Sequence, residues 1–520
     1  MNRQEQIIKL ESNPHFDIII IGGGATGLGC AVDAASRGMK TLLVEKYDFA
    51  KGTSSRSTKL VHGGVRYLAQ GNIRLVREAL LERGRLLKNA PHVCCTLPFV
   101  LPTYSFLQKM YYGFGLWIYE FLSGKLSLGK TKLLSKQAVQ NQLNNIAIEK
   151  LYGGIQYFDG QFDDSRLAIN LATTATEHGA VVANYCAVVG FIKQAGKLKG
   201  VKITDTINNS SIEATANIIV NATGVFADAI LHLAEGNTEK TIAPSQGVHL
   251  VIDKKYFAGT AGMMIPKTDD GRVLFAIPWN NKIVLGTTDT PVKNIETEPK
   301  PLQEEIDFII THFNRYTIAQ INYASIKSVY VGLRPLAKIN NEKKTAVMPR
   351  DHVVKILPSG LVHVTGGKWT TYRNMAEHAI NIAVKNTSHN YKKCVTQNLK
   401  IHGHTISKNN SHLDVYGADA INIEKLMAED ILLQEKIHHN YTYTKAEVIW
   451  IVQNEMAQTV EDVLARRIRL LFLDARAAIE TAPIVANILA TTLQKDFSWQ
   501  QQEIEKFTTL AKGYLYQPIK

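Results

Sequence analysis

The sequence has few cysteines and no regular spacing among them. Only five occur in 520 residues, and no two are separated by the two residues of a C-x-x-C motif. The first sixteen residues also lack the apolar core of a secretory signal peptide. These absences argue against a disulfide framework and against a zinc-ribbon type of metal site, so we expect no metal and a reducing, cytoplasmic compartment.

Long hydrophobic runs are missing as well. No stretch of eighteen consecutive apolar residues occurs, so we expect no bilayer-spanning helix. The content of 45% hydrophobic and 20% charged residues is typical of a soluble globular protein, and there is no internal repeat or low-complexity tract. Because 520 residues exceed what one compact core accommodates, about three domains are expected.

Acidic residues are scarce in one region of a chain whose net charge is +13. Residues 51–140 contain 14 Lys and Arg but only three acidic residues, a surplus of 11 positive charges. The three acidic residues are Glu78, Glu82 and Glu120. We expect this region to face an anionic partner.

A nucleotide-binding motif stands close to the N-terminus. Residues 17–21 are a short Ile-rich run of the kind that is buried on both faces of a parallel sheet. A G-x-G-x-x-G motif follows, residues 25–37 have helical spacing, and residues 41–44 resemble a second strand that ends at Glu45. The three glycines are Gly22, Gly24 and Gly27. This βαβ order predicts that the glycines and the helix N-terminus bind a pyrophosphate, and that Glu45 accepts from a ribose hydroxyl.

A loop rich in small hydroxyl residues follows, and it reads GTSSRSTKLVHGGVRYL over residues 52–68. Two later stretches, YVGLRPL at 330–336 and LVHVTGGKWTTYR at 361–373, complete the pattern. Together with the glycine motif, they resemble the FAD-dependent glycerol-3-phosphate dehydrogenase family of the aerobic, quinone-linked type. The resemblance extends to VEDVLARRIRLLFLD at 460–474, so it covers nearly the whole chain. It implies FAD as the cofactor rather than NAD.

The resemblance also implies which residues bind FAD. The A-T-G turn after the strand-like residues 218–221 would return the chain to the nucleotide, and the Gly-Gly pair before residue 368 would place a helix N-terminus near the flavin pyrimidine edge. A helix dipole there would stabilise the negative charge of reduced flavin. The expected cofactor-binding residues are Gly22, Gly24, Gly27, Glu45, Thr53, Ser54, Ser55, Ser57, Lys59, Leu60, Gly63, Gly64, Ala222, Thr223, Gly224, Gly366, Gly367, Lys368, Thr370 and Thr371.

The order of these segments predicts an α/β fold with a discontinuous, Rossmann-like FAD-binding domain of the glutathione-reductase type. We expect this domain to comprise residues 1–90, 151–243 and 331–395. Short strand patterns joined by turns predict an antiparallel-sheet substrate domain from residues 91–150 and 244–330. Residues 396–520 contain capping patterns such as Thr444-x-x-Glu447, which predict a C-terminal helical domain.

The family resemblance implies oxidation of sn-glycerol 3-phosphate to dihydroxyacetone phosphate. A hydride would pass from C2 to N5 of FAD, and the electrons would pass on to a membrane quinone. A phosphorylated substrate requires cations, and four of them stand in glycine- or proline-marked motifs. The expected substrate-binding residues are Arg66, Tyr67, Arg334, Arg350 and Lys368.

Hydride loss from C2 requires a base to remove the hydroxyl proton, and a histidine suits this role near neutral pH. His62 and His249 are the histidines within the family motifs, and Arg334 would steady the developing alkoxide. These three residues are the expected catalytic groups. The sequence does not decide which histidine is the base, and a structural role beside the flavin is the alternative for either.

Two segments of the basic region allow two interpretations each. Residues 73–88 predict an amphipathic helix, either a solvated basic helix or one that faces an anion. Residues 110–132 mix aromatics, glycines and lysines, which suits either a lipid headgroup boundary or a buried helix. Together with the resemblance, this pattern favours peripheral binding to the cytoplasmic face of the inner membrane. A homodimer is compatible with the sequence.

Three other functions share parts of this pattern. A glycerol-3-phosphate oxidase would pass the electrons to oxygen instead of a quinone. An FAD-dependent amine oxidase acting on glycine or sarcosine would not need four cations. A flavin-containing RNA-binding protein would use basic and aromatic residues, but the chain has no RNA-binding motif, so we expect no nucleic-acid partner.

Overall fold

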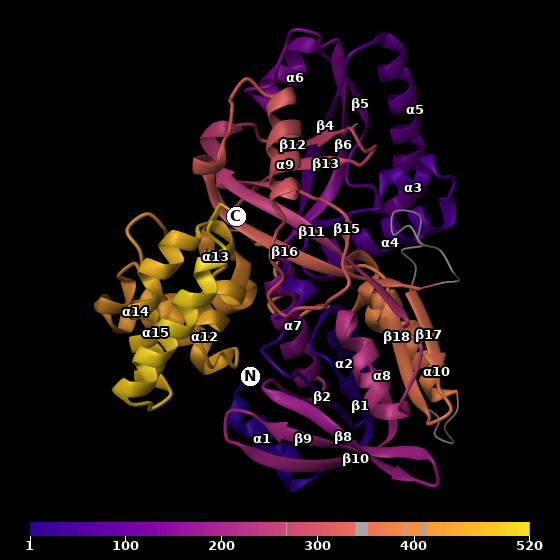
Figure 1. Ribbon diagram of the computed structural model, residues 1–520, viewed down its shortest axis with the longest axis vertical. Helices are drawn as coiled ribbons and strands as arrows, with labels where there is room; N and C mark the ends of the chain where they lie inside the picture. Colours follow the sequence, from indigo (N-terminus) through magenta and orange to yellow (C-terminus); the bar gives the residue numbers. More distant parts are fainter. Residues whose placement is uncertain are drawn as a thin grey trace.

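The computed structural model of the chain contains two β-sheets and a separate group of helices (Figure 1). It describes residues 1–266, 268–338, 352–385, 387, 391–407, 409 and 411–518, without the side chains of Arg66 and Ala69. In Figure 1 the first sheet lies below, the second lies above it, and the C-terminal helices stand to one side of both. The predicted α/β fold with a C-terminal helical domain is confirmed.

The first sheet has a parallel centre in the order β18-β10-β1-β2-β7. On one edge β17 joins it antiparallel, and the β8-β9 hairpin pairs with β10. The strands are β1 (His15–Ile21), β2 (Thr41–Val44), β7 (Val181–Ala183), β8 (Cys186–Gln194), β9 (Lys197–Asp205), β10 (Ser210–Asn221), β17 (His352–Ile356) and β18 (Leu361–Gly366).

Helices cover both faces of the parallel strands, which explains why β1 is apolar throughout its centre. Ile18 and Ile20 pack with α2 (Ala25–Ser36), α7 (Asp164–Glu177) and α10 (Tyr372–Val384). The opposite face is covered by α1 (Arg3–Ser12) and α8 (Ala227–Glu235) together with the β8-β9 hairpin. The carboxyl ends of β1, β2 and β10 end at one edge, because Ile21 is in register with both Val44 and Asn221.

The second sheet runs in the order β15-β11-β14-β13-β12-β4-β6-β3, with β16 on β11 and β5 on β6. Its strands are β3 (Leu60–Val61), β4 (Cys94–Thr103), β5 (Lys132–Ser135), β6 (Gly153–Phe162), β11 (Ile242–Asp253), β12 (Gly262–Ile265), β13 (Leu274–Trp279), β14 (Lys282–Gly286), β15 (Thr290–Pro291) and β16 (Ile326–Ala337). Every pairing in it is antiparallel except that of β12 with β4. The strands β3 and β6 pair here although their residues fall within the range expected for the FAD domain. The exact domain limits therefore stay a prediction.

Five helices accompany the second sheet. They are α3 (Val65–Ala69), α4 (Ile73–Asn89), α5 (Phe106–Ser123), α6 (Lys136–Leu143) and α9 (Gln303–Tyr316). The interpretation of α4 as a solvated basic helix needs correction at Arg83, which is 1% exposed. Its guanidinium binds Asp159 on β6 at 2.7 Å, because a buried cation needs a partner of opposite charge.

The C-terminal helices form a core that also includes Val251, Trp279, Val284 and Tyr330 of the second sheet. They are α11 (Ala420–Glu429), α12 (Lys445–Asn454), α13 (Leu470–Leu473), α14 (Ala475–Thr492) and α15 (Phe497–Lys512), with a π-helical turn at Asp462–Arg467. The predicted capping box at α12 is present, since the Thr444 amide donates to Glu447 at 2.8 Å and the Glu447 amide donates to the Thr444 hydroxyl. Over the part of the chain that the structure describes, no helix is both long and apolar enough to cross a bilayer.

Candidate active site

A cavity of about 650 Å³ lies between the two sheets, at the carboxyl ends of β1 and β2 and beside β11 and β16. It brings together most of the residues that the sequence predicts to bind cofactor or substrate. Those that line it are Gly22, Gly24, Glu45, Thr53, Ser54, Ser57, Leu60, His62, Tyr67, Ala222, Thr223, Gly224, His249, Arg334, Gly366, Gly367, Lys368 and Thr370.

The glycine motif forms the turn from β1 into α2. Gly22 has φ +111°, a left-handed value that favours glycine, and a Cβ there would lie 2.8 Å from the Ala222 carbonyl. A Cβ at Gly27 would run into the Gly22 carbonyl, so helix and strand could not approach as they do. Gly24 is the N-cap of α2 and carries no side chain to fill the space in front of it. This cradle fits a pyrophosphate at the helix N-terminus.

Glu45 stands at the end of β2 and borders the same cavity. Its carboxylate accepts from the Gly23 amide at 2.6 Å and from the Tyr47 amide at 2.9 Å. Burial raises the pKa of Glu45, although the two backbone hydrogen bonds oppose this effect. An acid fixed here can accept from a ribose hydroxyl, as the βαβ motif predicts.

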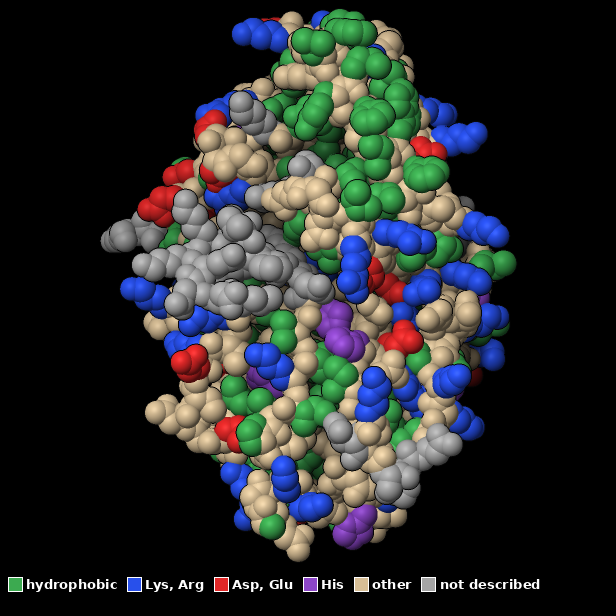
Figure 2. Space-filling view, turned by 90° about the vertical axis from the view of Figure 1, so that its right-hand side faces the viewer, with side chains coloured by type: hydrophobic (Ala, Val, Ile, Leu, Met, Phe, Trp, Pro, Cys, Tyr) green, Lys and Arg blue, Asp and Glu red, His purple; other side chains and the backbone are tan. Residues whose placement is uncertain are grey.

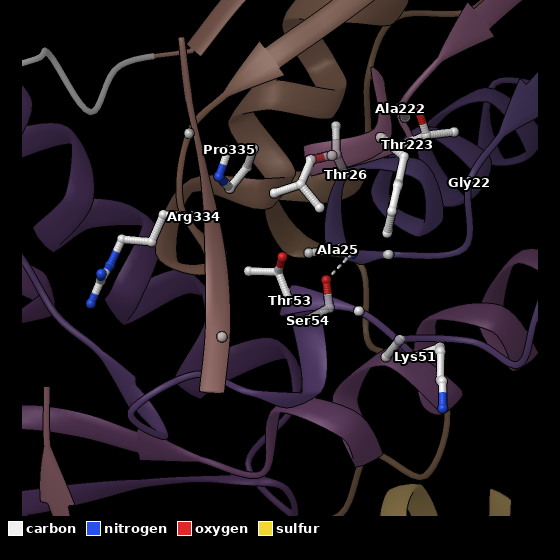
Figure 3. A pocket seen from close by; sticks show the side chains of 18 of the residues that line it. Gly22, Ala25, Thr26, Lys51, Thr53, Ser54, Ala222, Thr223, Arg334 and Pro335 are labelled. Atoms are coloured by element: carbon white, nitrogen blue, oxygen red, sulfur yellow. Dashed lines mark hydrogen bonds between the residues drawn. The ribbon is translucent and has the colours of Figure 1, made fainter. Parts of the chain in front are cut away.

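The hydroxyl-rich loop ties the glycine turn to the second sheet. Ser54 Oγ accepts from the Ala25 amide at 2.9 Å, the contact drawn in Figure 3, and the Ser54 carbonyl accepts from Trp369 Nε1 at 2.8 Å. Thr53 donates to the Leu333 carbonyl on β16 at 2.5 Å. These bonds hold the loop between α2, β16 and the segment that precedes α10.

Six of the described residues predicted to bind FAD are not part of the cavity surface, namely Gly27, Ser55, Lys59, Gly63, Gly64 and Thr371. The structure corrects the expectation for Lys59, whose side chain is fully buried. Its ammonium donates to Asp164 at 2.8 Å and to the Ser55 carbonyl at 2.9 Å. Burial lowers the pKa of Lys59 to about 8 even though Asp164 raises it. Lys59 therefore stabilises the hydroxyl loop from its buried side and does not line the cavity.

Two of the cations expected to bind substrate, Arg334 and Lys368, line the same cavity as the glycine turn. Figure 3 shows Arg334 on β16 pointing away from Ala25. Its guanidinium donates to the Thr288 carbonyl at 2.9 Å and pairs with Asp289 at 3.2 Å. Lys368 Nζ lies 4.2 Å from the centre of the Tyr67 ring. Arg350 and the side chain of Arg66 lie outside the described residues, so their predicted roles stay predictions.

The two candidate histidines both line the cavity, in different surroundings. His62 donates its amide to Thr370 Oγ1 at 3.1 Å, and its ring lies edge-on to Phe275. His249 is 3% exposed, stacks on Tyr330 at 4.6 Å, and has Nε2 2.8 Å from Thr58 Oγ1. Burial, with the charges of Lys59 and Arg334 added, holds the pKa of His249 well below its usual value.

Several contributing residues were not predicted, although three lie within the quoted motifs and one directly precedes a motif. Thr58 and Tyr330 fix the His249 ring, and Trp369 anchors the hydroxyl loop. Lys51, just before the hydroxyl loop, lines the cavity and pairs with Glu298 at 2.7 Å. Their places in or beside these motifs were the available signal, but their partners are distant in sequence.

Comparison with known proteins decides the family. The model of the FAD dependent oxidoreductase family matches residues 17–379, and that of the C-terminal domain of alpha-glycerophosphate oxidase matches residues 362–503. The mitochondrial glycerol-3-phosphate dehydrogenase of Homo sapiens is 36% identical, and the match covers 99% of this chain and 76% of that protein. The chain belongs to the FAD-dependent glycerol-3-phosphate dehydrogenase family.

Other members and folds agree with this placement. The mitochondrial glycerol-3-phosphate dehydrogenase SDP6 of Arabidopsis thaliana is 35% identical over 97% of this chain and 87% of its own length. A crystal structure of the Bacillus halodurans glycerol-3-phosphate dehydrogenase complexed with FAD superposes with a TM-score of 0.81 at 26% identity, covering 100% of this chain and 99% of that one. L-alpha-glycerophosphate oxidase from Mycoplasma pneumoniae, with a TM-score of 0.57 at 16% identity over 74% of this chain and 97% of that one, shares the fold.

FAD is the cofactor of this glycerol-3-phosphate dehydrogenase family member, and the residues present fit it. The space in front of Gly24 and the α2 N-terminus accommodates a pyrophosphate, and Glu45 can accept from the ribose. The Gly366-Gly367 turn, with φ of +75° and +85°, also lines the cavity and leads into the short helical turn before α10.

Replacing Gly24 by valine is expected to abolish FAD binding. A Cβ at this position would already lie 3.0 Å from Ser54 Oγ, and the branched side chain would fill the space in front of the helix N-terminus. The measurement is the FAD-to-protein ratio after purification, from absorbance and from FAD released on denaturation. Gly190→Val on β8 is the matched control, because a Cβ there lies 3.6 Å from its nearest neighbour. A Gly24→Val variant that retains one FAD per chain would contradict the assignment.

Proposed function

We propose that the protein oxidises sn-glycerol 3-phosphate to dihydroxyacetone phosphate and passes the electrons to a membrane quinone. The observation that carries the reaction is the arrangement of one cavity. It combines a nucleotide cradle with Arg334, Lys368, His62 and His249 on one continuous lining. The relatives at 35% and 36% identity carry the name of this activity.

FAD, when bound, supplies the acceptor for the hydride that leaves C2 of the substrate. Lys368 and Arg334 are proposed to bind different parts of that substrate. Lys368 offers a point charge to the phosphate, and Tyr67 beneath it limits where the ammonium can lie. Arg334 is held by the Thr288 carbonyl and Asp289, so its guanidinium is fixed before substrate arrives and can stabilise negative charge on the C2 oxygen.

The surroundings of the two histidines favour different roles for them. A base must take up a proton, and this is unfavourable for His249, whose pKa is lowered by burial and by Lys59 and Arg334. His249 is therefore proposed to remain neutral and to orient substrate. His62 lines the cavity directly after β3, the edge strand of the second sheet, and is proposed to accept the C2 hydroxyl proton.

Arg334→Ala and Lys368→Ala are each expected to lower kcat/KM for glycerol 3-phosphate by more than about tenfold, a loss of roughly 1.4 kcal/mol in transition-state stabilisation. Steady-state kinetics with an artificial electron acceptor measures this loss, with FAD content determined alongside. Arg315→Ala is the control, because Arg315 is half-exposed on α9 and pairs with Asp269. A loss of activity equal to that of the control would argue against the substrate-binding roles proposed for Arg334 and Lys368.

The proposed electron acceptor stays in the lipid, and the structure offers a surface that could meet it. Helix α5 buries Gly113, Leu116, Tyr119 and Ser123 on one side and exposes large apolar side chains on the other. The exposed ones are Phe106, Leu107, Met110, Tyr111, Phe114, Trp117 and Phe121. Figure 2 shows hydrophobic side chains gathered over the upper part of the face that carries α5.

Basic residues border this apolar face, which we call the α5 face. Lys125, Lys130, Lys132 and Lys136 are all exposed within the fourteen residues that follow the helix. Each Lys or Arg near an anionic lipid surface contributes about 1 kcal/mol of attraction. Aromatic and aliphatic anchors flanked by lysines support peripheral attachment, which we propose to occur on the cytoplasmic face of the inner membrane. An oxidase that uses oxygen would have no need of such a surface.

In a flotation assay at low salt, the protein is expected to bind anionic liposomes through the α5 face and to float with them. High salt should weaken this binding because it screens the lysines. Replacing Leu107, Phe114 and Phe121 by serine should weaken binding at least tenfold. The matched control replaces Ile431, Leu432 and Phe497, which are 59–73% exposed on the C-terminal helices. If wild type stays with the soluble fraction at low salt, or if both triple variants bind alike, the α5 face is not the membrane contact.

A further inference from the structure

A buried hydrogen-bond network connects α5 to the loop that carries His62. The Gly63 amide donates to Tyr119 Oη at 2.7 Å, and Tyr119 Oη donates to the Asp159 carboxylate at 2.9 Å. Arg83 on α4 completes the network through an ion pair with Asp159 at 2.7 Å and a bond to Ser123 Oγ at 3.1 Å. All four side chains are at most 3% exposed.

The direction of these bonds follows from the protonation of the phenol. Burial, and then the charge of Asp159, raises the pKa of Tyr119 well above its usual value, so the phenol stays protonated. Its hydrogen is directed to Asp159, which leaves an oxygen lone pair for the Gly63 amide. A phenylalanine at this position would leave a buried amide and a buried carboxylate each without one partner.

His62 is fixed on both sides through the backbone. Its own amide donates to Thr370 Oγ1 at 3.1 Å, on the segment before α10, and the next amide along the chain donates to Tyr119. The loop packs closely against α4 and α5, since a Cβ at Gly63 would lie 2.7 Å from Leu80 on α4 and 2.8 Å from the Tyr119 ring on α5. The two amide bonds therefore set where the imidazole enters the cavity.

We propose that Tyr119 is a positioning residue for His62, acting through the Gly63 amide and held in place by Asp159 and Arg83. It touches neither cofactor nor substrate, because it does not line the cavity. This inference rests on the proposed role of His62 as the base. Reactions that depend on a positioned proton acceptor are sensitive to displacements of about 1 Å, which can cost up to about a hundredfold in rate.

The test is a double-mutant cycle with Tyr119→Phe and His62→Ala in the FAD-loaded enzyme. Tyr119→Phe is expected to lower kcat about tenfold while KM for glycerol 3-phosphate and FAD content change less than twofold. In the His62→Ala background the same substitution should have no further effect on kcat, because the residue it positions is gone. A purely structural role would instead lower kcat by the same factor in both backgrounds, and that result would overturn the proposal.

Tyr157→Phe is the matched control. Tyr157 is 2% exposed, and the centre of its ring lies 6.3 Å from that of the Tyr119 ring. Its hydroxyl donates to Met264 Sδ rather than to the loop. It should retain wild-type kcat, and a loss equal to that of Tyr119→Phe would overturn the proposal. Should Tyr119→Phe purify without FAD, Arg83→Lys replaces it in the cycle, because it keeps the charge beside Asp159 and loses the bond to Ser123.

The activity of wild type distinguishes a failure of the proposed function from a failure of the positioning role of Tyr119. If wild type does not oxidise glycerol 3-phosphate, the proposed function is wrong, and the positioning role falls with it. If wild type is active and Tyr119→Phe is equally active, the positioning role alone is wrong.

Discussion

Asp164, at the start of α7, accepts hydrogen bonds from two distant parts of the chain. Lys59 approaches at 2.8 Å and the Ser57 hydroxyl at 2.7 Å from the hydroxyl loop, and Arg469 approaches at 2.9 Å from the C-terminal helices. Asp164, Lys59 and Arg469 are almost fully buried, so none of these charges could remain without the others. Burial would raise the pKa of Asp164, but Lys59 and Arg469 lower it below its usual range, so the carboxylate stays charged.

The cofactor cavity consequently depends on contacts among α7, the hydroxyl loop and the C-terminal helices. The loop that caps α2 rests on Asp164, and Arg469 of the helical domain also donates to the Ser55 carbonyl of that loop at 2.8 Å. A second buried acid, Asp48, just after β2, pairs with Arg466 and Arg467 of the π-helical turn. The C-terminal helices thus support the nucleotide end of the cavity without lining it through a catalytic group.

Local patterns in the sequence were sufficient for the parts of the site that depend on neighbouring residues. The β1-α2-β2 unit could be predicted to within two residues, because its glycines, apolar runs and terminal acid lie within 30 residues of one another. The surroundings of Lys59 and Arg83 could not, since their partners Asp164 and Asp159 are 105 and 76 residues away. The lowered pKa of His249 likewise follows from burial and from the charges of Lys59 and Arg334, and it is the β11-β16 pairing that brings Arg334 near.

In this cavity, glycerol 3-phosphate is expected to reduce the bound flavin. The most direct test of this reaction is the visible absorbance of the purified, FAD-loaded protein under anaerobic conditions during titration with glycerol 3-phosphate. The flavin bands should bleach with this substrate and persist with glycerol, lactate, glycine or sarcosine, because only the phosphorylated alcohol carries a dianion for the cations that line the cavity. A colourless protein, or bleaching by sarcosine or glycine at a similar rate, would contradict this expectation.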